Sequence, residues 1–129
     1  MVDTIINTGL LSAATELGKV ISNCKQAKIF KEASQVFSNN EDAIKLYNDY
    51  VVMQREFRIA EQQGEDTETD YNKLVDLENQ LMQNQVFKNY LDVQNAFIDY
   101  LKEINQSISE HLPFDFATYA KPAGNSCCS

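Results

Sequence analysis

Apolar residues recur every three or four positions along almost the whole chain, and this spacing constrains the fold more than any other feature. It gathers apolar side chains on one face of an α-helix, whereas a half-buried strand requires strict alternation. Four glycines and two prolines among 129 residues are too few for a sandwich or barrel built on tight turns. The sequence therefore predicts an all-α fold.

The apolar pattern divides the chain into a five-helix bundle over residues 1–112 and a short C-terminal tail over residues 113–129. The predicted helices cover residues 4–24, 26–37, 41–63, 68–84 and 86–112. The third and fourth helices should form a long antiparallel hairpin, because residues 64–67 hold a turn between them. The aromatic half of the tail is expected to dock on the bundle.

Three helix ends carry recognisable signals. Asn40 is expected to cap the third helix, and Pro113 to stop the fifth. Thr67 followed by Asp70 resembles a capping box with Asp in the Glu position, so the fourth helix should begin after Thr67.

Length and charge limit the function classes. A chain of 129 residues forms one domain that needs no metal or disulfide to fold. The net charge of −8 argues against a general nucleic-acid binder, whose affinity comes from neutralising phosphates. We find no basic leader and no apolar run of about 20 residues, so a cytoplasmic protein without a membrane span is expected.

The chain offers no catalytic constellation, and we predict that it is not an enzyme. His111 is the only histidine, and the glycines are isolated, so no phosphate-cradling loop exists. Glu78 falls inside the predicted apolar arc of its helix, where a carboxylate needs a partner or a path to water. We expect Glu78 to form a buried or interfacial ion pair rather than to act in catalysis.

Acidic residues are concentrated around the predicted hairpin turn. From Glu61 to Glu78 there are seven acids and one base. The acidic patch nearest the turn consists of Glu61, Glu65, Asp66, Glu68 and Asp70. It is either a solvated hairpin tip or a docking surface for a basic partner.

A small basic patch lies on the predicted second helix. Lys25, Lys28 and Lys31 are either a solvated face or, in the alternative reading, the site of an RNA- or phosphate-binding module. A salt titration of RNA binding separates these readings, because phosphate contacts weaken steeply with salt.

Two helices carry more apolar surface than one core requires. Val52 and Ile59 lie seven residues apart and point away from the main stripe of their helix. The fifth helix is apolar over about half its circumference, a face that includes Phe97 and Ile104. These four residues are the predicted interface, with intramolecular packing as the other reading.

The three cysteines divide into two groups. Cys24 lies within an apolar arc and is expected to be a small buried residue. Cys127 and Cys128 stand in the polar tail, where packing does not explain them. Two thiolates supply half of a four-ligand zinc or iron–sulfur site, so a second chain would have to complete it.

The order of these segments resembles a known family. The resemblance is carried by Cys24-Lys25-Gln26-Ala27, Phe30-Lys31-Glu32-Ala33, Asn40-Glu41-Asp42-Ala43 and Tyr50-Val51-Val52-Met53-Gln54-Arg55-Glu56-Phe57. With a long closing helix and a cysteine-bearing tail, the chain is similar to the YlbF/YmcA family of small helical bacterial regulators.

The resemblance implies a non-enzymatic regulatory adaptor. It implies a homo- or hetero-oligomer with family-like regulators and the protein YaaT, and action in competence, sporulation and biofilm control through ribonuclease Y and messenger RNA processing. It also implies an iron–sulfur cluster shared within a complex, for which only Cys127 and Cys128 match the tail position. No direct contact with nucleic acid is expected.

Overall fold

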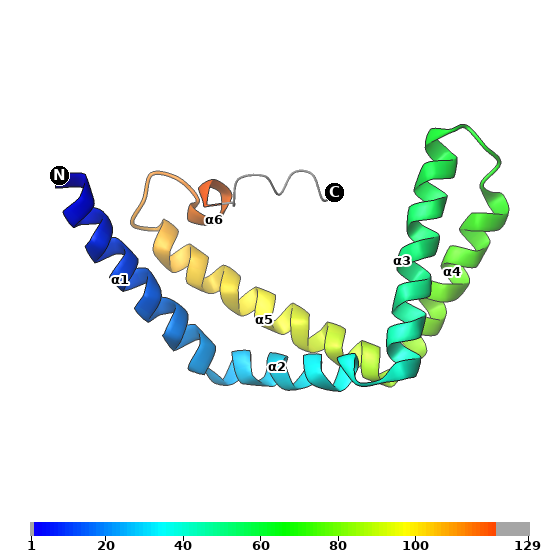
Figure 1. Cartoon of the computed structure of the whole chain (residues 1–129), viewed down its shortest axis with the longest axis horizontal. Helices are drawn as coiled ribbons and strands as arrows, with labels where there is room; N and C mark the ends of the chain where they lie inside the picture. Colours follow the sequence, from blue (N-terminus) through cyan, green and yellow to red (C-terminus); the bar gives the residue numbers. More distant parts are fainter. Residues whose placement is uncertain (1, 121–129) are drawn as a thin grey trace.

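The protein consists of two helical arms that meet at a corner (Figure 1). The computed structural model describes residues 2–120, with side chains from residue 8 onward. The helices are α1 (Val2–Asn23), α2 (Lys25–Ser38), α3 (Glu41–Gln62), α4 (Glu68–Gln83), α5 (Gln85–Ser109) and the short α6 (Phe116–Tyr119). One arm holds α1, α2, α5 and α6, and the other is the antiparallel α3/α4 hairpin.

Side-chain caps fix the joints between successive helices. The Oδ1 atom of Asn40 accepts a hydrogen bond from the Ala43 amide at 2.9 Å, and Asn84 caps α5 in the same way through the Phe87 amide at 3.0 Å. Asn84 has extended backbone angles and therefore ends α4 and begins α5. Each asparagine satisfies an amide that the first turn of a helix leaves free.

Gly64 ends α3 with the backbone that only glycine adopts readily. Its φ of 71° lies in the left-handed region. The Gly64 amide donates to the Glu61 carbonyl and the Glu65 amide donates to the Ala60 carbonyl, both at 3.1 Å. These two bonds form a Schellman motif, which closes the helix and turns the chain toward α4.

The core sits at the corner between the arms. Phe37, Ala43, Leu81 and Phe87 are buried there, from α2, α3, α4 and α5 respectively. The Phe37 ring lies 4.7 Å from the Tyr90 ring in a stacked arrangement, and its centroid is 5.8 Å from the Phe87 ring. Four helices are thus joined by one apolar cluster, to which α4 contributes Leu81.

The first arm is held by packing between α2 and α5. The Phe30 ring stacks on Phe97 at 5.3 Å and on Tyr90 at 6.0 Å, and Ala33 of α2 is buried. Beyond this zone α1 bends away from the line of α2 (Figure 1), and residues of α1 and α5 line an open groove.

The structure confirms the predicted all-α class, its five long helices and the antiparallel hairpin of the third and fourth. The Asn40 cap is also confirmed. The predicted capping box is wrong, because the Thr67 side chain makes no capping hydrogen bond and Asp66 accepts from the Glu68 amide instead, at 3.1 Å. The fifth helix ends at Ser109, and a short sixth helix lies within the predicted tail.

None of the helices within residues 2–120 is long and apolar enough to cross a membrane.

We expect Phe37→Ala to destabilise the protein by about 3–5 kcal/mol, because it removes the ring shared by α2, α3 and α5 and leaves a cavity. Val36→Ala is the matched control, since Val36 is 56% exposed and its truncation should cost less than about 0.5 kcal/mol. Urea unfolding followed by circular dichroism measures both. Equal losses in the two variants would contradict the corner as the main core.

Candidate functional site

The outer face of α3 is exposed along its length. Phe57 faces α4, where its ring lies 6.1 Å from the Tyr71 ring, and Ala60 is buried on the same side. Val52 and Ile59 lie on the other side and are 49% and 47% exposed. The structure thus places both predicted interface residues on a free flank of the hairpin.

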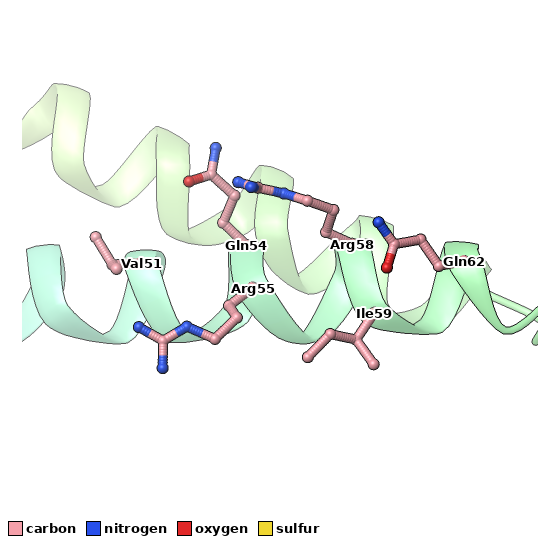
Figure 2. A pocket seen from close by; sticks show the side chains of 6 residues that line it. All are labelled: Val51, Gln54, Arg55, Arg58, Ile59 and Gln62. Carbon is pink, nitrogen blue, oxygen red and sulfur yellow. The ribbon is translucent and has the colours of Figure 1, made fainter. Parts of the chain in front are cut away.

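Two arginines lie beside Ile59 on this face. Val51, Gln54, Arg55, Arg58, Ile59 and Gln62 line a shallow groove of about 390 Å³. Figure 2 shows Arg55 and Ile59 pointing away from α4. This arginine pair was not predicted from the sequence, although residues three positions apart are neighbours on a helix surface.

The acidic patch surrounds the hairpin turn, as predicted. Four of its five members are exposed, and Asp70 is half-buried. The ion pairs among the described side chains are Lys19–Glu16 and Lys102–Asp99, so the acidic patch and the arginine pair have no ionic partner there. Uncompensated charge of one sign at a protruding tip attracts a partner of opposite charge.

The predictions for Glu78 and Cys24 require correction. Glu78 is exposed and needs no partner, because the hairpin has only two helices and no third element covers that side of α4. Cys24 is half-buried rather than buried, since it sits at the bend between α1 and α2. Its Sγ atom accepts a hydrogen bond from the Ala27 amide at 3.4 Å and so caps α2.

Phe97 and Ile104 are both half-buried on α5. The Phe97 ring is partly covered by Phe30. Ile104 lines an open groove between α1, α5 and α6, far along the first arm from the hairpin. The four predicted interface residues therefore do not form one continuous surface, and their role in binding stays a prediction.

The segment after Pro113 is attached to α5 by polar contacts. The Nδ2 group of Asn105 donates to Asp115 at 2.7 Å, while its Oδ1 atom accepts from the Ala117 amide at 2.9 Å. The Phe116 amide donates to the Ser109 hydroxyl at 2.9 Å. The predicted docking of this aromatic segment is found, although polar side chains of α5 rather than apolar ones hold it.

Asp115 is the centre of these contacts. Its carboxylate accepts from the Thr118 hydroxyl at 2.6 Å and from the Thr118 amide at 3.0 Å. The bonds from Thr118, followed by that from Asn105, favour the ionised form and lower the pKa of Asp115 below its ordinary value of 3.8.

The remaining candidates lie apart from one another. Lys25, Lys28 and Lys31 are exposed on α2, and His111 is exposed after α5. The described part of the chain contains no cluster of three or more His, Cys, Asp or Glu side chains that could hold a metal ion. Cys127 and Cys128 lie outside the described residues.

The fold and surfaces define an all-helical protein with two open arms and exposed surfaces at both ends. Residues 10–113 match the family model for control of the competence regulator ComK, YlbF/YmcA, so the chain belongs to this family. The chain is also 28% identical over 114 residues to a UPF0342 protein of Clostridium tetani (strain Massachusetts / E88). That alignment covers 82% of this chain and 96% of the relative.

Acidification should release the segment after Pro113 from α5. The carboxylate contacts that lower the pKa of Asp115 stabilise docking above pH 3.8, and this contribution is lost as the pH falls through the lowered pKa. The amide resonance of Thr118 should therefore titrate with a midpoint below 3.8. In Asp115→Asn that transition should be absent, and a midpoint at or above 3.8 in the unaltered protein would refute this.

Proposed function

We propose that the protein is a non-enzymatic regulatory adaptor that binds other proteins through its α3/α4 hairpin. The observation that carries this proposal is the outer face of α3. There Val52 and Ile59 expose apolar surface beside two arginines that have no ionic partner among the described side chains. Membership of a family that controls a competence regulator supports a regulatory role.

The chemistry of the chain favours binding over catalysis. Four of the five carboxylates of the acidic patch are exposed at a protruding turn, whereas a general acid or base works in a site that excludes water. Exposed apolar residues flanked by charge are typical of protein interfaces, where the apolar centre supplies affinity and the charged rim supplies specificity.

The partners we propose are proteins of the same regulatory system. By its resemblance to the YlbF/YmcA regulators, the chain should assemble with related family members and a YaaT-like protein, and act in the cytoplasm on ribonuclease Y-dependent processing of messenger RNA. The acidic patch would steer a basic surface of such a partner toward the hairpin. The apolar pair on α3 would then hold it.

We expect Val52→Asp combined with Ile59→Asp to remove the partner. Two carboxylates in the centre of an interface leave charge buried and unpaired, so the affinity should fall at least about 30-fold. Tagged protein expressed in its own host is purified with its partners, which mass spectrometry identifies. Both side chains are nearly half exposed, so the helicity and the unfolding midpoint should change little.

Val36→Asp is the matched control, because Val36 is also exposed, at 56%, but lies on α2 in the other arm. It should retain the partner. Capture of the same family-like proteins by the double variant would contradict the hairpin as the docking surface. RNA binding with a steep salt dependence that is lost when Lys25, Lys28 and Lys31 become glutamine would favour the RNA-binding alternative instead.

We also propose that Cys127 and Cys128 supply two ligands to an iron–sulfur or zinc site completed by a partner. Iron and zinc are measured in the complex purified without oxygen, using the unaltered protein and the variant with both cysteines changed to serine. The complex formed by the variant should contain less metal. The melting temperature of the isolated chain should not change, because two thiolates cannot complete a four-ligand site within one chain and its fold therefore does not depend on the metal. Equal metal content would rule out the ligand role.

A further inference from the structure

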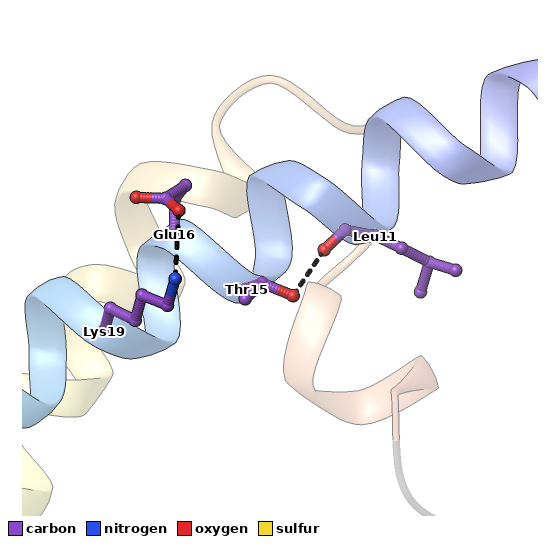
Figure 3. Close-up of polar contacts among 4 residues, drawn as sticks. All are labelled: Leu11, Thr15, Glu16 and Lys19. Carbon is purple, nitrogen blue, oxygen red and sulfur yellow. Dashed lines mark hydrogen bonds and ion pairs between the residues drawn. The ribbon is translucent and has the colours of Figure 1, made fainter.

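The ion pairs among the described side chains link residues three positions apart on one helix. Figure 3 shows Lys19 of α1 paired at 3.5 Å with Glu16, which lies three residues earlier. On α5, Lys102 pairs in the same way with Asp99 at 3.9 Å. Residues three and four positions apart are the neighbours that a helix surface offers. A cation without an acid at these positions needs a partner from elsewhere.

Arg55 and Arg58 of α3 are cations of this second kind. The residues three or four positions from Arg55 are uncharged or basic: Val51, Val52, Arg58 and Ile59. Glu61 lies three residues after Arg58, but the ion pairs found among side chains 8–120 do not include it. Two like charges three residues apart on a helix repel each other, so a carboxylate from outside would stabilise both arginines.

The arginines occupy the middle of two rows of side chains along α3. Each row has a spacing of four residues, and the rows are Val51, Arg55, Ile59 and Gln54, Arg58, Gln62. Together they line the groove of about 390 Å³ on the outer face of this helix. Figure 2 shows Arg55 on one side of this stripe and Arg58 on the other. Rows with this spacing form ridges, and the groove between two ridges accepts a ridge of another helix.

A carboxylate in the middle of this groove would lie between two guanidinium groups. Each guanidinium presents its N–H donors in a fixed fork that matches the two oxygens of a carboxylate. Val51 and Ile59 offer apolar contacts four residues before and after Arg55. The groove therefore favours a ridge that is acidic in the middle and apolar at its ends.

The acidic patch next to the groove limits the other occupants. It begins at Glu61, three residues after Arg58, and continues through the hairpin turn. A nucleic acid or an anionic membrane carries negative charge along its whole surface and would be repelled there. A helix carries its charges at separate positions, so it can place a carboxylate over the arginines and a neutral or basic residue near Glu61.

We infer that the groove on α3 binds an amphipathic helix of the partner protein, with one Asp or Glu held between Arg55 and Arg58. Apolar residues four positions before and after this carboxylate would contact Val51 and Ile59. A helix with lysine in place of the acid would be rejected by the two guanidinium groups. The inference rests on the proposed docking at the hairpin and specifies the chemistry of the partner surface.

The combined variant Arg55→Gln with Arg58→Gln tests this pairing. The probe is the protein that co-purifies with the unaltered chain, and calorimetry measures its dissociation constant at about 150 mM salt. The variant should bind at least about 30-fold more weakly, because the carboxylate of the partner helix is then buried without a counter-charge.

Lys45→Gln with Lys73→Gln is the matched control. Both lysines are exposed on the same hairpin and lie outside the groove, so the control removes the same amount of charge. It should change the affinity less than about threefold, since it leaves the carboxylate between the arginines intact. Equal losses in the two double variants would overturn the inference.

A covalent crosslink locates the carboxylate. Arg55→Lys keeps the positive charge, and a carbodiimide joins an amine to a carboxylate in direct contact with release of water. Mass spectrometry should find position 55 joined to an Asp or Glu of the partner that has apolar residues four positions before and after it. If the partner stays bound but position 55 is joined only to this chain, or to a segment without that pattern, the inference is wrong.

Val52→Asp with Ile59→Asp separates this inference from the proposed function. If that variant keeps the partner, docking at the hairpin is wrong and the pairing with the arginines falls with it. If it loses the partner while Arg55→Gln with Arg58→Gln binds at full strength, the docking surface stands and the pairing alone is overturned. All four side chains are exposed, so the helicity and the unfolding midpoint should change little in either variant.

Discussion

The stacked rings around Phe37 are the contact on which the rest of the structure depends. Phe37 lies against Tyr90 and Phe87 from α5 and Tyr47 from α3, and Ala43 beside them is completely buried. Because α2, α3, α4 and α5 all have one end at this corner, each can extend outward with only one close neighbour. The packing therefore weakens with distance from the corner, and the ends of both arms retain exposed apolar side chains.

The sequence could predict the helices and their joints because those signals are local. Asn40 and Gly64 act within one turn of their own positions, through a capped amide and a left-handed backbone. The burial of Glu78 and Cys24 was predicted wrongly. An apolar arc indicates which side of a helix is suited to burial, but it does not indicate whether a neighbouring helix covers that side. That depends on the corner, which joins residues 37, 43, 81 and 87 across the whole chain.

The sequence predicted the exposure of the residues on α3 but not the contacts that hold the segment after Pro113. The exposure of Val52 and Ile59 followed from their position opposite the main stripe of the helix, which α4 covers. The role of Asn105 could not be predicted from the sequence, because an amide within an apolar face could either set the register between helices or hold a following segment. Only the fold shows that it binds Asp115 and Ala117, ten and twelve residues further along.

The two ends of the molecule differ in the physical basis of their binding. The hairpin carries unpaired charge at its turn, so it attracts a partner of opposite charge over a distance of about 10 Å. This attraction weakens as the salt concentration rises. The groove beside α1 is apolar and nearly neutral, so its contacts act at short range and depend little on salt. The corner holds the hairpin and this groove apart, at opposite ends of the molecule (Figure 1). Such separation is what an adaptor requires, because occupation of one surface does not block the other.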